Sequence, residues 1–270
     1  MPLGPLVVNI LTADLVGSSA LTLVPVTAPM TAPHSLDTLD AIAAADGRHL
    51  IAGINGGYFY RLDVNNFFDG VCIGKSASVA ELPPNTKTPN TGVADGAIVS
   101  RGVLLGSNCD CLGYNMPVFL TLNGSSSVID VLGRAAPPPA GLLLDSLAAG
   151  PNLVSTNSSG TFIDVRNGDE NFANVYEWSA NTGIGFTMNG TSSVFVTFDG
   201  FDGCAQTNGT CGTNAFTMAY FFKDFLMVEK AMGMDQGGST TMWVEGEGIV
   251  TNPGANARPI FSGLFLQQQV

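Results

Sequence analysis

The chain has 270 residues, and its 10 Lys and Arg against 22 Asp and Glu give a formal net charge of −12. This balance argues against nucleic-acid binding, which needs clustered cations, and against binding to an anionic membrane surface. No apolar run reaches the roughly 18 residues that a membrane-spanning helix needs, and the start of the sequence shows no secretory signal peptide. The length and the absence of a linker predict a single domain over residues 1–270.

The surface is expected to carry few charges. Charged residues make up 12% of the chain, against about a quarter in ordinary soluble domains, and the mean hydropathy is +0.27. Two interpretations follow: glycans cover the surface, or other subunits do. Four Asn-x-Ser/Thr sequons are candidate glycosylation sites of a secreted protein, at Asn123, Asn157, Asn189 and Asn208.

The five cysteines predict disulfide chemistry rather than a metal site. Cys204 and Cys211 flank a polar loop that a disulfide between them would close. Cys109 and Cys111 are too close in sequence for an easy mutual bridge, so one of them is a candidate partner of Cys72, and the odd total leaves one thiol over. Zinc is disfavoured because there is no Cys-x-x-Cys pair and the chain has only two histidines.

The first predicted elements are two strands and a helix. Residues 6–15 and 20–27 alternate or run apolar on either side of a Gly-Ser-Ser turn, which predicts a hairpin. Residues 36–45 have the apolar spacing of a helix, with Ser35 as a plausible N-cap and Gly47 as the stop.

A second helix is predicted over residues 214–230, where Phe, Met and Leu form an apolar stripe. Further short strands are predicted at 50–54, 97–105, 117–122, 161–165, 184–188, 194–198 and 242–244. These elements predict an α+β fold with mixed or antiparallel sheets and two main helices. The order strand, helix, strand, glycine turn occurs around residues 20–59 and again around 194–242, which suggests an internal duplication.

Two polar, glycine-rich turns each follow an apolar run. They are residues 55–57 (Asn-Gly-Gly) and 235–239 (Asp-Gln-Gly-Gly-Ser). Glycine lets a backbone approach a ligand closely, and consecutive amides in such a turn can bind an anion. The sequence therefore predicts one site that both turns build together.

Five segments in order carry a resemblance to a known family. They are residues 55–59 (Asn-Gly-Gly-Tyr-Phe), 149–154 (Ala-Gly-Pro-Asn-Leu-Val), 196–200 (Val-Thr-Phe-Asp-Gly), 235–242 (Asp-Gln-Gly-Gly-Ser-Thr-Thr-Met), and Asn252-Pro253 followed by Arg258. With them the chain resembles the phosphodiester glycosidase family over roughly residues 6–267. The resemblance implies that family's fold and the extracellular hydrolysis of a sugar-1-phosphodiester or a related glycan linkage.

The resemblance also implies roles for charged residues. Glycoside cleavage needs stabilisation of an oxocarbenium-like centre, and a phosphate leaves without much protonation, so one carboxylate suffices. Asp235 is the first candidate for this stabiliser or base, and Asp199 is the second, with Asp202 in reserve. Arg258 is the cation expected near the phosphate. No cofactor or metal is expected, although the three aspartates offer oxygen ligands of the kind that Ca²⁺ takes.

The glycine turns are expected to hold the rest of the substrate. Asn55 is expected to bind sugar hydroxyls and to belong to the catalytic group. The remaining substrate-binding candidates are the backbones of Gly56 and Gly57 for the sugar, and Gly237, Gly238, Ser239 and Thr240 for the anion.

Three positions depart from the pattern of the family. Asn181 and Phe201 stand where the family usually has arginine, and Gln236 replaces the first glycine of a triple-glycine turn. Neither asparagine nor phenylalanine can replace the planar, always charged fork of arginine at a phosphate.

These departures motivate a second hypothesis. Under this hypothesis the chain is an inactive, self-assembling subunit of an extracellular filament or coat on the same scaffold, with or without glycans. The low charge fits this hypothesis, since the centres of large subunit contacts are depleted in charge. An extended segment such as residues 3–26 could add a strand to a neighbour's sheet. The expected partners are thus a glycan or sugar phosphate, or a homo-oligomer or polymer.

Overall fold

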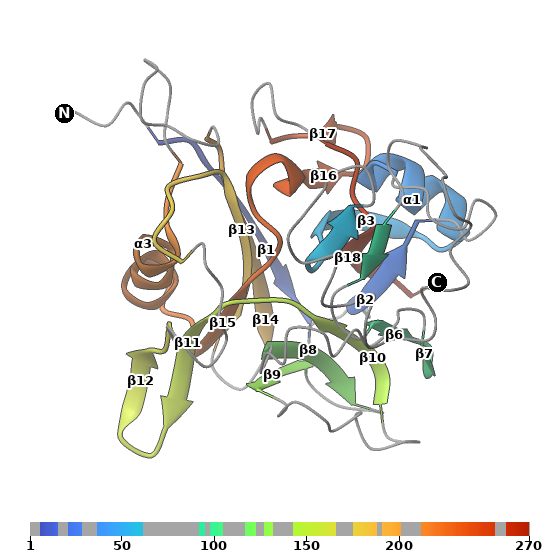
Figure 1. Ribbon diagram of the computed structural model, residues 1–270. Coiled ribbons are helices and arrows are strands. Elements are labelled where there is room, and N and C mark those ends of the chain that lie inside the picture. The colour runs from blue at the N-terminus through green and yellow to red at the C-terminus, as the bar shows by residue number, and fades with distance from the viewer. Residues whose placement is uncertain are drawn as a thin grey trace, which may run out of the picture.

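The computed structural model describes the chain in twelve segments. These are residues 6–15, 21–28, 37–61, 92–94, 98–104, 117–122, 127–131, 143–165, 175–187, 191–200, 212–251 and 258–269. Their strands form three larger sheets and one two-stranded sheet, in which every pair of neighbouring strands is antiparallel (Figure 1). The predicted α+β class is confirmed.

The first sheet has six strands in the order β1-β14-β13-β15-β11-β12. Their bounds are β1 Val8–Asp14, β11 Asn152–Asn157, β12 Gly160–Ile163, β13 Asn181–Phe186, β14 Ser192–Phe198 and β15 Lys230–Gly233. Alternation along β14 sends side chains to two separate cores. Phe195 enters one core, whereas Val194, Val196 and Phe198 enter another beneath the second helix. A strand buried on both faces explains why its sequence reads as a continuous apolar run.

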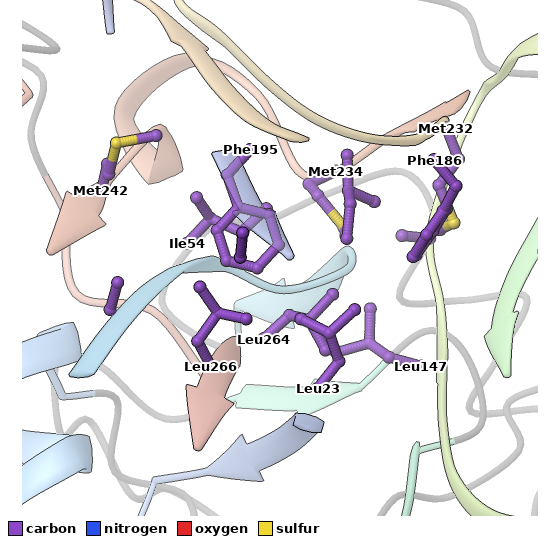
Figure 2. Close-up of a cluster of buried hydrophobic side chains, with 14 residues drawn as sticks. Leu23, Ile54, Leu147, Phe186, Phe195, Met232, Met234, Met242, Leu264 and Leu266 are labelled. Atoms are coloured by element: carbon purple, nitrogen blue, oxygen red, sulfur yellow. The ribbon is translucent and has the colours of Figure 1, made fainter. Parts of the chain in front are cut away.

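The second sheet has the order β17-β16-β3-β18-β2 and lies against the first. Its strands are β2 Leu21–Thr27, β3 Leu50–Asn55, β16 Met242–Val244, β17 Gly248–Ile249 and β18 Ser262–Gln268. Figure 2 shows the shared core, where Phe195 and Met234 from the first sheet's side meet Ile54 and Leu264 from the second. The outer face of the second sheet packs against helix α1, Leu39–Asp46.

The third sheet, β7-β6-β10-β8-β9, lies beside these two layers (Figure 1). Its strands are β6 Ile98–Ser100, β7 Val103–Leu104, β8 Pro117–Leu122, β9 Ser127–Val131 and β10 Leu143–Ala148. The two-stranded sheet consists of β4 Phe59–Arg61 and β5 Gly92–Ala94.

The predicted N-terminal hairpin is wrong, although both of its strands exist. β1 pairs with β14 in the first sheet, and β2 pairs with β18 in the second. Each strand therefore finds a partner from a distant part of the chain. Apolar alternation identifies a strand that buries one face, but it does not say which other strand pairs with it.

Both predicted helices exist, with corrected ends. The first begins after Thr38 rather than Ser35 and stops at Gly47, whose φ of 70° is the left-handed conformation that glycine favours. The second is shorter than predicted: α3 covers Ala215–Tyr220 and a π-helical turn, η3, continues it over Phe221–Phe225. The chain then enters β15, which was not predicted.

The suspected duplication has a counterpart in the topology. In one unit, β2 and β3 run in the same direction on either side of the antiparallel β18, and α1 covers the outer face. In the other, β14 and β15 run in the same direction on either side of β13, with α3 outside. Each unit ends in one of the two glycine turns. We refer to them as the β2–β3 unit and the β14–β15 unit.

Candidate functional site

The ends of three strands meet at one edge of the two packed sheets. β14 and β15 both run antiparallel to β13, so both end at the edge where β13 begins. Asp199 follows β14 directly, and Asp235 lies two residues beyond β15. Two strand spacings separate β14 from β15, which corresponds to roughly 10 Å between their backbones. The end of β3 reaches the same edge through Asn55.

Main-chain hydrogen bonds join the two glycine turns, as predicted. The Asp235 amide donates to the Gly56 carbonyl at 3.0 Å, and the Asn55 amide donates to the Thr241 carbonyl at 3.1 Å. The Gly237 amide in turn donates to the carbonyl of Ala180 at 2.8 Å, next to the start of β13. The turns thus close onto each other and onto the first sheet.

The side chain of Asn55 joins the two turns at this junction. Its Nδ2 donates to the carbonyls of Asp235 at 2.8 Å and Gly56 at 3.3 Å. Its Oδ1 accepts from the Thr182 hydroxyl at 2.7 Å and the Thr241 amide at 3.0 Å. A side-chain amide has two donor hydrogens and two acceptor lone pairs, so its capacity is used. The binding of sugar hydroxyls by Asn55 stays a prediction, and a sugar would have to compete with these four contacts.

The glycines of the first turn are required by the protein itself. A Cβ on Gly56 would lie 2.2 Å from Oγ of Ser262, and one on Gly57 would lie 2.1 Å from the Ala148 carbonyl oxygen. The Gly56 amide and carbonyl are both engaged, with Ser262 and Asp235. The close approach that glycine permits here is thus to neighbouring strands, and the binding of a sugar by these two glycines stays a prediction.

We expect Gly57→Ala to destabilise the fold, because the atom that its Cβ meets is main chain and cannot rotate away. Overpacking of this kind costs about 1–3 kcal/mol in the free energy of unfolding, which thermal and urea unfolding would measure. Ser158→Ala, in the exposed turn between β11 and β12, is the control. An unchanged midpoint for Gly57→Ala would contradict this packing.

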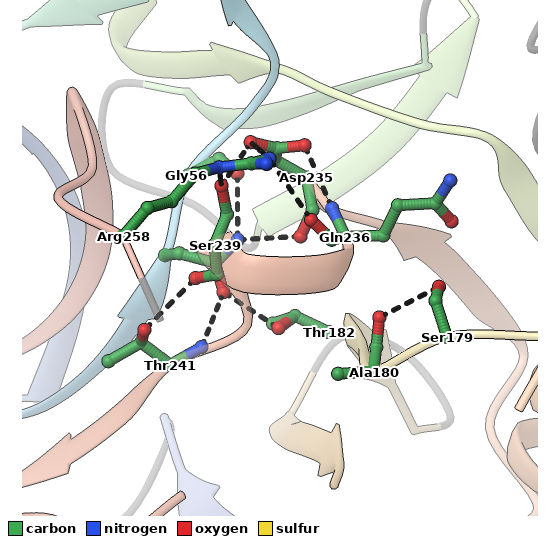
Figure 3. A network of polar contacts seen from close by, with 10 residues as sticks. Gly56, Ser179, Ala180, Thr182, Asp235, Gln236, Ser239, Thr241 and Arg258 are labelled. Carbon is green, nitrogen blue, oxygen red and sulfur yellow. Dashed lines mark hydrogen bonds and ion pairs between the residues drawn. The ribbon is translucent and has the colours of Figure 1, made fainter. Parts of the chain in front are cut away.

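Asp235 is the centre of a buried polar network, shown in Figure 3. Its carboxylate accepts from the Ser239 hydroxyl at 2.5 Å, from the Gln236 amide at 2.9 Å and from Nη2 of Arg258 at 3.3 Å. The residue is 5% exposed. Burial raises the pKa of Asp235 above its usual value, and the nearby Arg258 charge and the hydrogen bonds oppose that rise only in part.

Arg258 brings the predicted cation to this carboxylate. Besides the ion pair, its Nε donates to Oγ of Ser239 at 2.9 Å, and Nη2 reaches the Gln236 carbonyl at 3.3 Å. Its own amide donates to the Gly238 carbonyl at 3.0 Å. With 29% of its side chain exposed, against 7% for Asp235, Arg258 is the member of the network that is accessible to an anion.

The expected cradle of consecutive amides is not open in this structure. The Gly237 amide is bound to Ala180, and the Ser239 amide to the Gln236 carbonyl at 3.4 Å, within a single 3-10 turn over Gly237–Ser239. Thr240 follows, fully buried, and its hydroxyl has no hydrogen-bond partner in the described part of the chain. Positive charge at this site therefore comes from the Arg258 side chain more than from the turn.

Asp199 is buried at the end of β14, where its Oδ1 accepts from Nδ2 of Asn9 at 3.1 Å. Asn9 also contacts the Thr197 hydroxyl at 3.3 Å. Asp202 and Phe201, the other residues singled out in this segment, lie outside the described residues. The structure therefore places two of the three candidate aspartates, both at the same sheet edge.

Asn181, which replaces one family arginine, has a structural contact set. Its Nδ2 donates to the carbonyls of Ser179 at 3.1 Å and Thr213 at 2.7 Å. The same two residues form an isolated β-bridge. Asn181 thus ties the start of β13 to the segment before α3.

Several predictions lie outside the described residues. All five cysteines are among them, including the pair Cys204 and Cys211, and so are the sequons at Asn123, Asn189 and Asn208. Asn157 is described, and it lies exposed at the end of β11. Within the described ranges, no group of three or more His, Cys, Asp or Glu side chains is placed to hold a metal ion.

Two residues of the site were not predicted. Thr182 supports Asn55, and Asn9 supports Asp199. The sequence could have indicated Asn9. Alternate residues of a strand point to the same face, and Asn9 shares its face with Leu11 and Ala13, which border the shared core. A polar residue in an apolar phase needs a polar partner. Thr182 offers no such signal, since its strand is buried on both faces.

Comparisons with known proteins agree with this architecture. The profile of the phosphodiester glycosidase family matches residues 48–267. A comparison with curated proteins gave no significant match. Among solved structures, the fold is similar to the zebrafish N-acetylglucosamine-1-phosphodiester alpha-N-acetylglucosaminidase catalytic domain, auto-inhibited by its pro-peptide. The TM-score is 0.61 at 19% identity, covering 98% of this chain and 84% of that chain.

Two further solved structures share the fold at lower identity. A hypothetical protein from Synechocystis has a TM-score of 0.59 at 14% identity, covering 98% of this chain and 59% of that chain. A protein from Burkholderia pseudomallei K96243 has a TM-score of 0.59 at 16% identity, covering 97% of this chain and 74% of that chain. The described helices include none long and apolar enough to cross a membrane. The match of the family profile covers most of the sequence, and the chain belongs to the phosphodiester glycosidase family.

Proposed function

We propose that this chain is an extracellular hydrolase that cleaves a sugar-1-phosphodiester at the bond between the anomeric carbon and its oxygen. Water supplies a hydroxyl to the sugar and a proton to the departing phosphate monoester, so the products are a free sugar and that monoester. The observation that supports it best is the network of Asp235, Ser239 and Arg258 at the junction of the two turns.

The network has the charges that this reaction needs. Negative charge develops on the phosphate as it leaves, and the partly exposed guanidinium of Arg258 can receive it. The sugar becomes positively charged at its anomeric carbon, where a carboxylate stabilises it. Asp235 takes that role through its fixed position, since Ser239, Gln236 and Arg258 already orient it and no reorganisation is needed. Asp199 is the second carboxylate at the same edge.

Isotope labelling tests the bond assignment directly. A panel of methyl phosphodiesters of hexoses and N-acetylhexosamines, linked at the anomeric carbon, would be incubated with the protein in ¹⁸O-water. Mass spectrometry should find the label in the sugar and none in the phosphate. Label in the phosphate would contradict glycosidic cleavage and indicate a phosphodiesterase. No turnover of any member by folded protein would contradict the hydrolase proposal.

We expect Arg258→Lys to lower turnover of a hydrolysed phosphodiester by about tenfold to a hundredfold, because lysine keeps the charge and loses the fork of contacts. Steady-state kinetics on the best substrate of the panel would measure it. Arg101→Lys, in an exposed turn outside the network, is the matched control. If Arg258→Lys were as active as Arg101→Lys, Arg258 would not contribute to catalysis.

The alternative, a self-assembling structural subunit, has one specific observation in its favour. Three apolar side chains lie strongly exposed around the end of the second helix: Tyr220 at 57%, Phe225 at 69% and Met227 at 77%. Exposed apolar surface of this kind marks contact sites when it is contiguous. Analytical ultracentrifugation of the wild type and of Phe225→Asp would show whether the wild type assembles and whether the substitution prevents it. A wild-type protein that is monomeric at all concentrations would exclude assembly through this surface.

A further inference from the structure

A cavity of about 350 Å³ lies apart from the Asp235 network, between α1, the end of β2 and the β6–β7 hairpin. Its size is at the lower end of the range for small-molecule sites. None of its lining residues belongs to the network. Val26 and Ile42 belong to the core beneath α1, on the opposite face of the second sheet from the shared core. The cavity is therefore a separate feature of the fold.

Arg48 provides an unsatisfied donor in the cavity wall. Its side chain is only 7% exposed, and its Nε and Nη2 are both bound to the carboxylate of Asp46, Nη2 at 2.8 Å. Its Nη1 is buried and has no hydrogen-bond partner within the residues that the structure describes. A buried donor left unpaired is unfavourable, so a ligand that brought an acceptor within reach of Nη1 would gain a hydrogen bond.

The charged groups in the cavity wall and directly behind it balance one another. Asp46 pairs with Arg48, and the buried Asp145 of β10 lies within electrostatic reach of both Arg48 and Arg101. The Arg101 amide donates to Oδ1 of Asp145 at 3.0 Å, which fixes the hairpin turn over that carboxylate. Two cations and two acids give no net charge, in a chain of formal charge −12. A phosphate or another multiply charged anion therefore gains little here.

The remaining wall combines apolar surface with hydroxyls. Thr27 and Ser100 contribute hydroxyl groups, whereas Val26, Ile42 and Val103 contribute aliphatic surface. A ligand that suits this wall has an apolar face, and it carries groups that accept from a guanidinium and donate to a carboxylate or hydroxyl. Alcohol hydroxyls do both.

We propose that this cavity binds one neutral sugar residue, as a second carbohydrate site distinct from the hydrolytic one. A sugar ring has hydroxyls that both donate and accept, and C–H groups that pack on aliphatic side chains. Arg48 Nη1 and the Arg101 guanidinium would donate to its hydroxyls, and the acidic side would accept from them. This site does not depend on whether the chain hydrolyses phosphodiesters.

Ligand-observed NMR tests the site on the whole chain with Asp235→Asn, so that hydrolysis cannot consume or generate ligands. The probes are the methyl glycosides of glucose, galactose, mannose and N-acetylglucosamine. At least one is expected to saturate. Ala45→Trp at the cavity rim should abolish that binding, and Arg101→Ala should weaken it about tenfold, the loss of one or two hydrogen bonds to a charged group. Lys223→Ala, in the exposed pair with Asp224, should bind as before.

Three outcomes would overturn the proposal. One is that no glycoside binds to the Asp235→Asn protein although that protein shows a single cooperative unfolding transition. Another is that Ala45→Trp binds the sugar as well as its parent does. The third is that sodium octanoate or inorganic phosphate binds at the cavity and the glycosides do not. Saturable binding with these variant effects supports the site even if the labelling experiment finds no hydrolysis, so the two proposals fail separately.

Discussion

Replacing Asp235 with asparagine is expected to lower the hydrolytic rate constant by about 10²- to 10⁴-fold, the usual contribution of a positioned catalytic carboxylate. Asparagine keeps the shape, but Gln236 and Ser239 donate to different oxygens of Asp235, so its single oxygen can accept from only one of them. What it lacks is the negative charge that faces the developing positive charge of the sugar. Single-turnover kinetics on the best phosphodiester would isolate this effect from product release.

The same variant has a predicted effect on stability, with a defined dependence on pH. Burial raises the folded-state pKa of Asp235 above its usual 3.8, so folding favours the protonated form. That stabilisation is complete below pH 3.8 and is lost as the pH rises through the raised pKa. Asparagine does not titrate. The stability of Asp235→Asn relative to wild type should therefore increase from acid to neutral pH.

Urea unfolding across that pH range would measure the difference, with Asp224→Asn, at an exposed acid of the second helix, as the control. If Asp235→Asn lost activity without losing stability at neutral pH, Asp235 would be a residue that serves catalysis and not stability. A relative stability that falls toward neutral pH would mean that the ion pair with Arg258 outweighs the cost of burial. That result would contradict the raised pKa.

Asn55→Leu is expected to lower the free energy of unfolding by about 3–5 kcal/mol. Leucine has similar bulk and no polar atoms. It would leave the Thr182 hydroxyl, the Thr241 amide and the Asp235 carbonyl without the partner that Asn55 provides, in a place that is 1% exposed. Denaturant unfolding followed by far-UV circular dichroism would measure the loss.

Two further variants calibrate this result. Thr182→Val removes one of the four contacts and should cost about 1–2 kcal/mol. Ser158→Leu, in the exposed turn between β11 and β12, should stay within about 0.5 kcal/mol of wild type. If Asn55→Leu were as stable as Ser158→Leu and only its substrate affinity fell, Asn55 would be a substrate ligand and not a structural residue.

The sequence predicted local elements well because their signals are local. Strand β14 was found from its apolar run and helix α1 from apolar periodicity, and the stop at Gly47 was found from a residue that tolerates a φ of 70°. Pairing of strands was not predictable in the same way. Residues 6–15 and 20–27 look like a hairpin, yet each has an apolar face that a different sheet buries more fully.

The second helix shows that an apolar stripe does not locate the end of a helix. The apolar stripe of residues 214–230 continues past the helix because Val228 and Ala231 remain in the core beneath it, now on the chain leading into β15. Burial alone does not distinguish a last helical turn from a first strand residue. The π-helical turn Phe221–Phe225 gives no recognisable signal of its own.

The site was predicted in location and only partly in detail. Motif order put Asp235, Arg258 and the glycine turns together, and the contacts agree. The role of Asn55 cannot be predicted from the sequence, because a polar residue at a strand end can serve the protein or a ligand equally well. Only the count of its four partners separates these possibilities, and three of them come from distant segments.

The matched β2–β3 and β14–β15 units have a consequence for inactivation. Each unit ends in one glycine turn, and neither turn alone contains both Asn55 and Asp235. Asn55 and Asp235 therefore come together only where the two units pack against each other. Heating should abolish turnover at the temperature at which the two units separate. Neither unit should hydrolyse the substrate when it is produced alone.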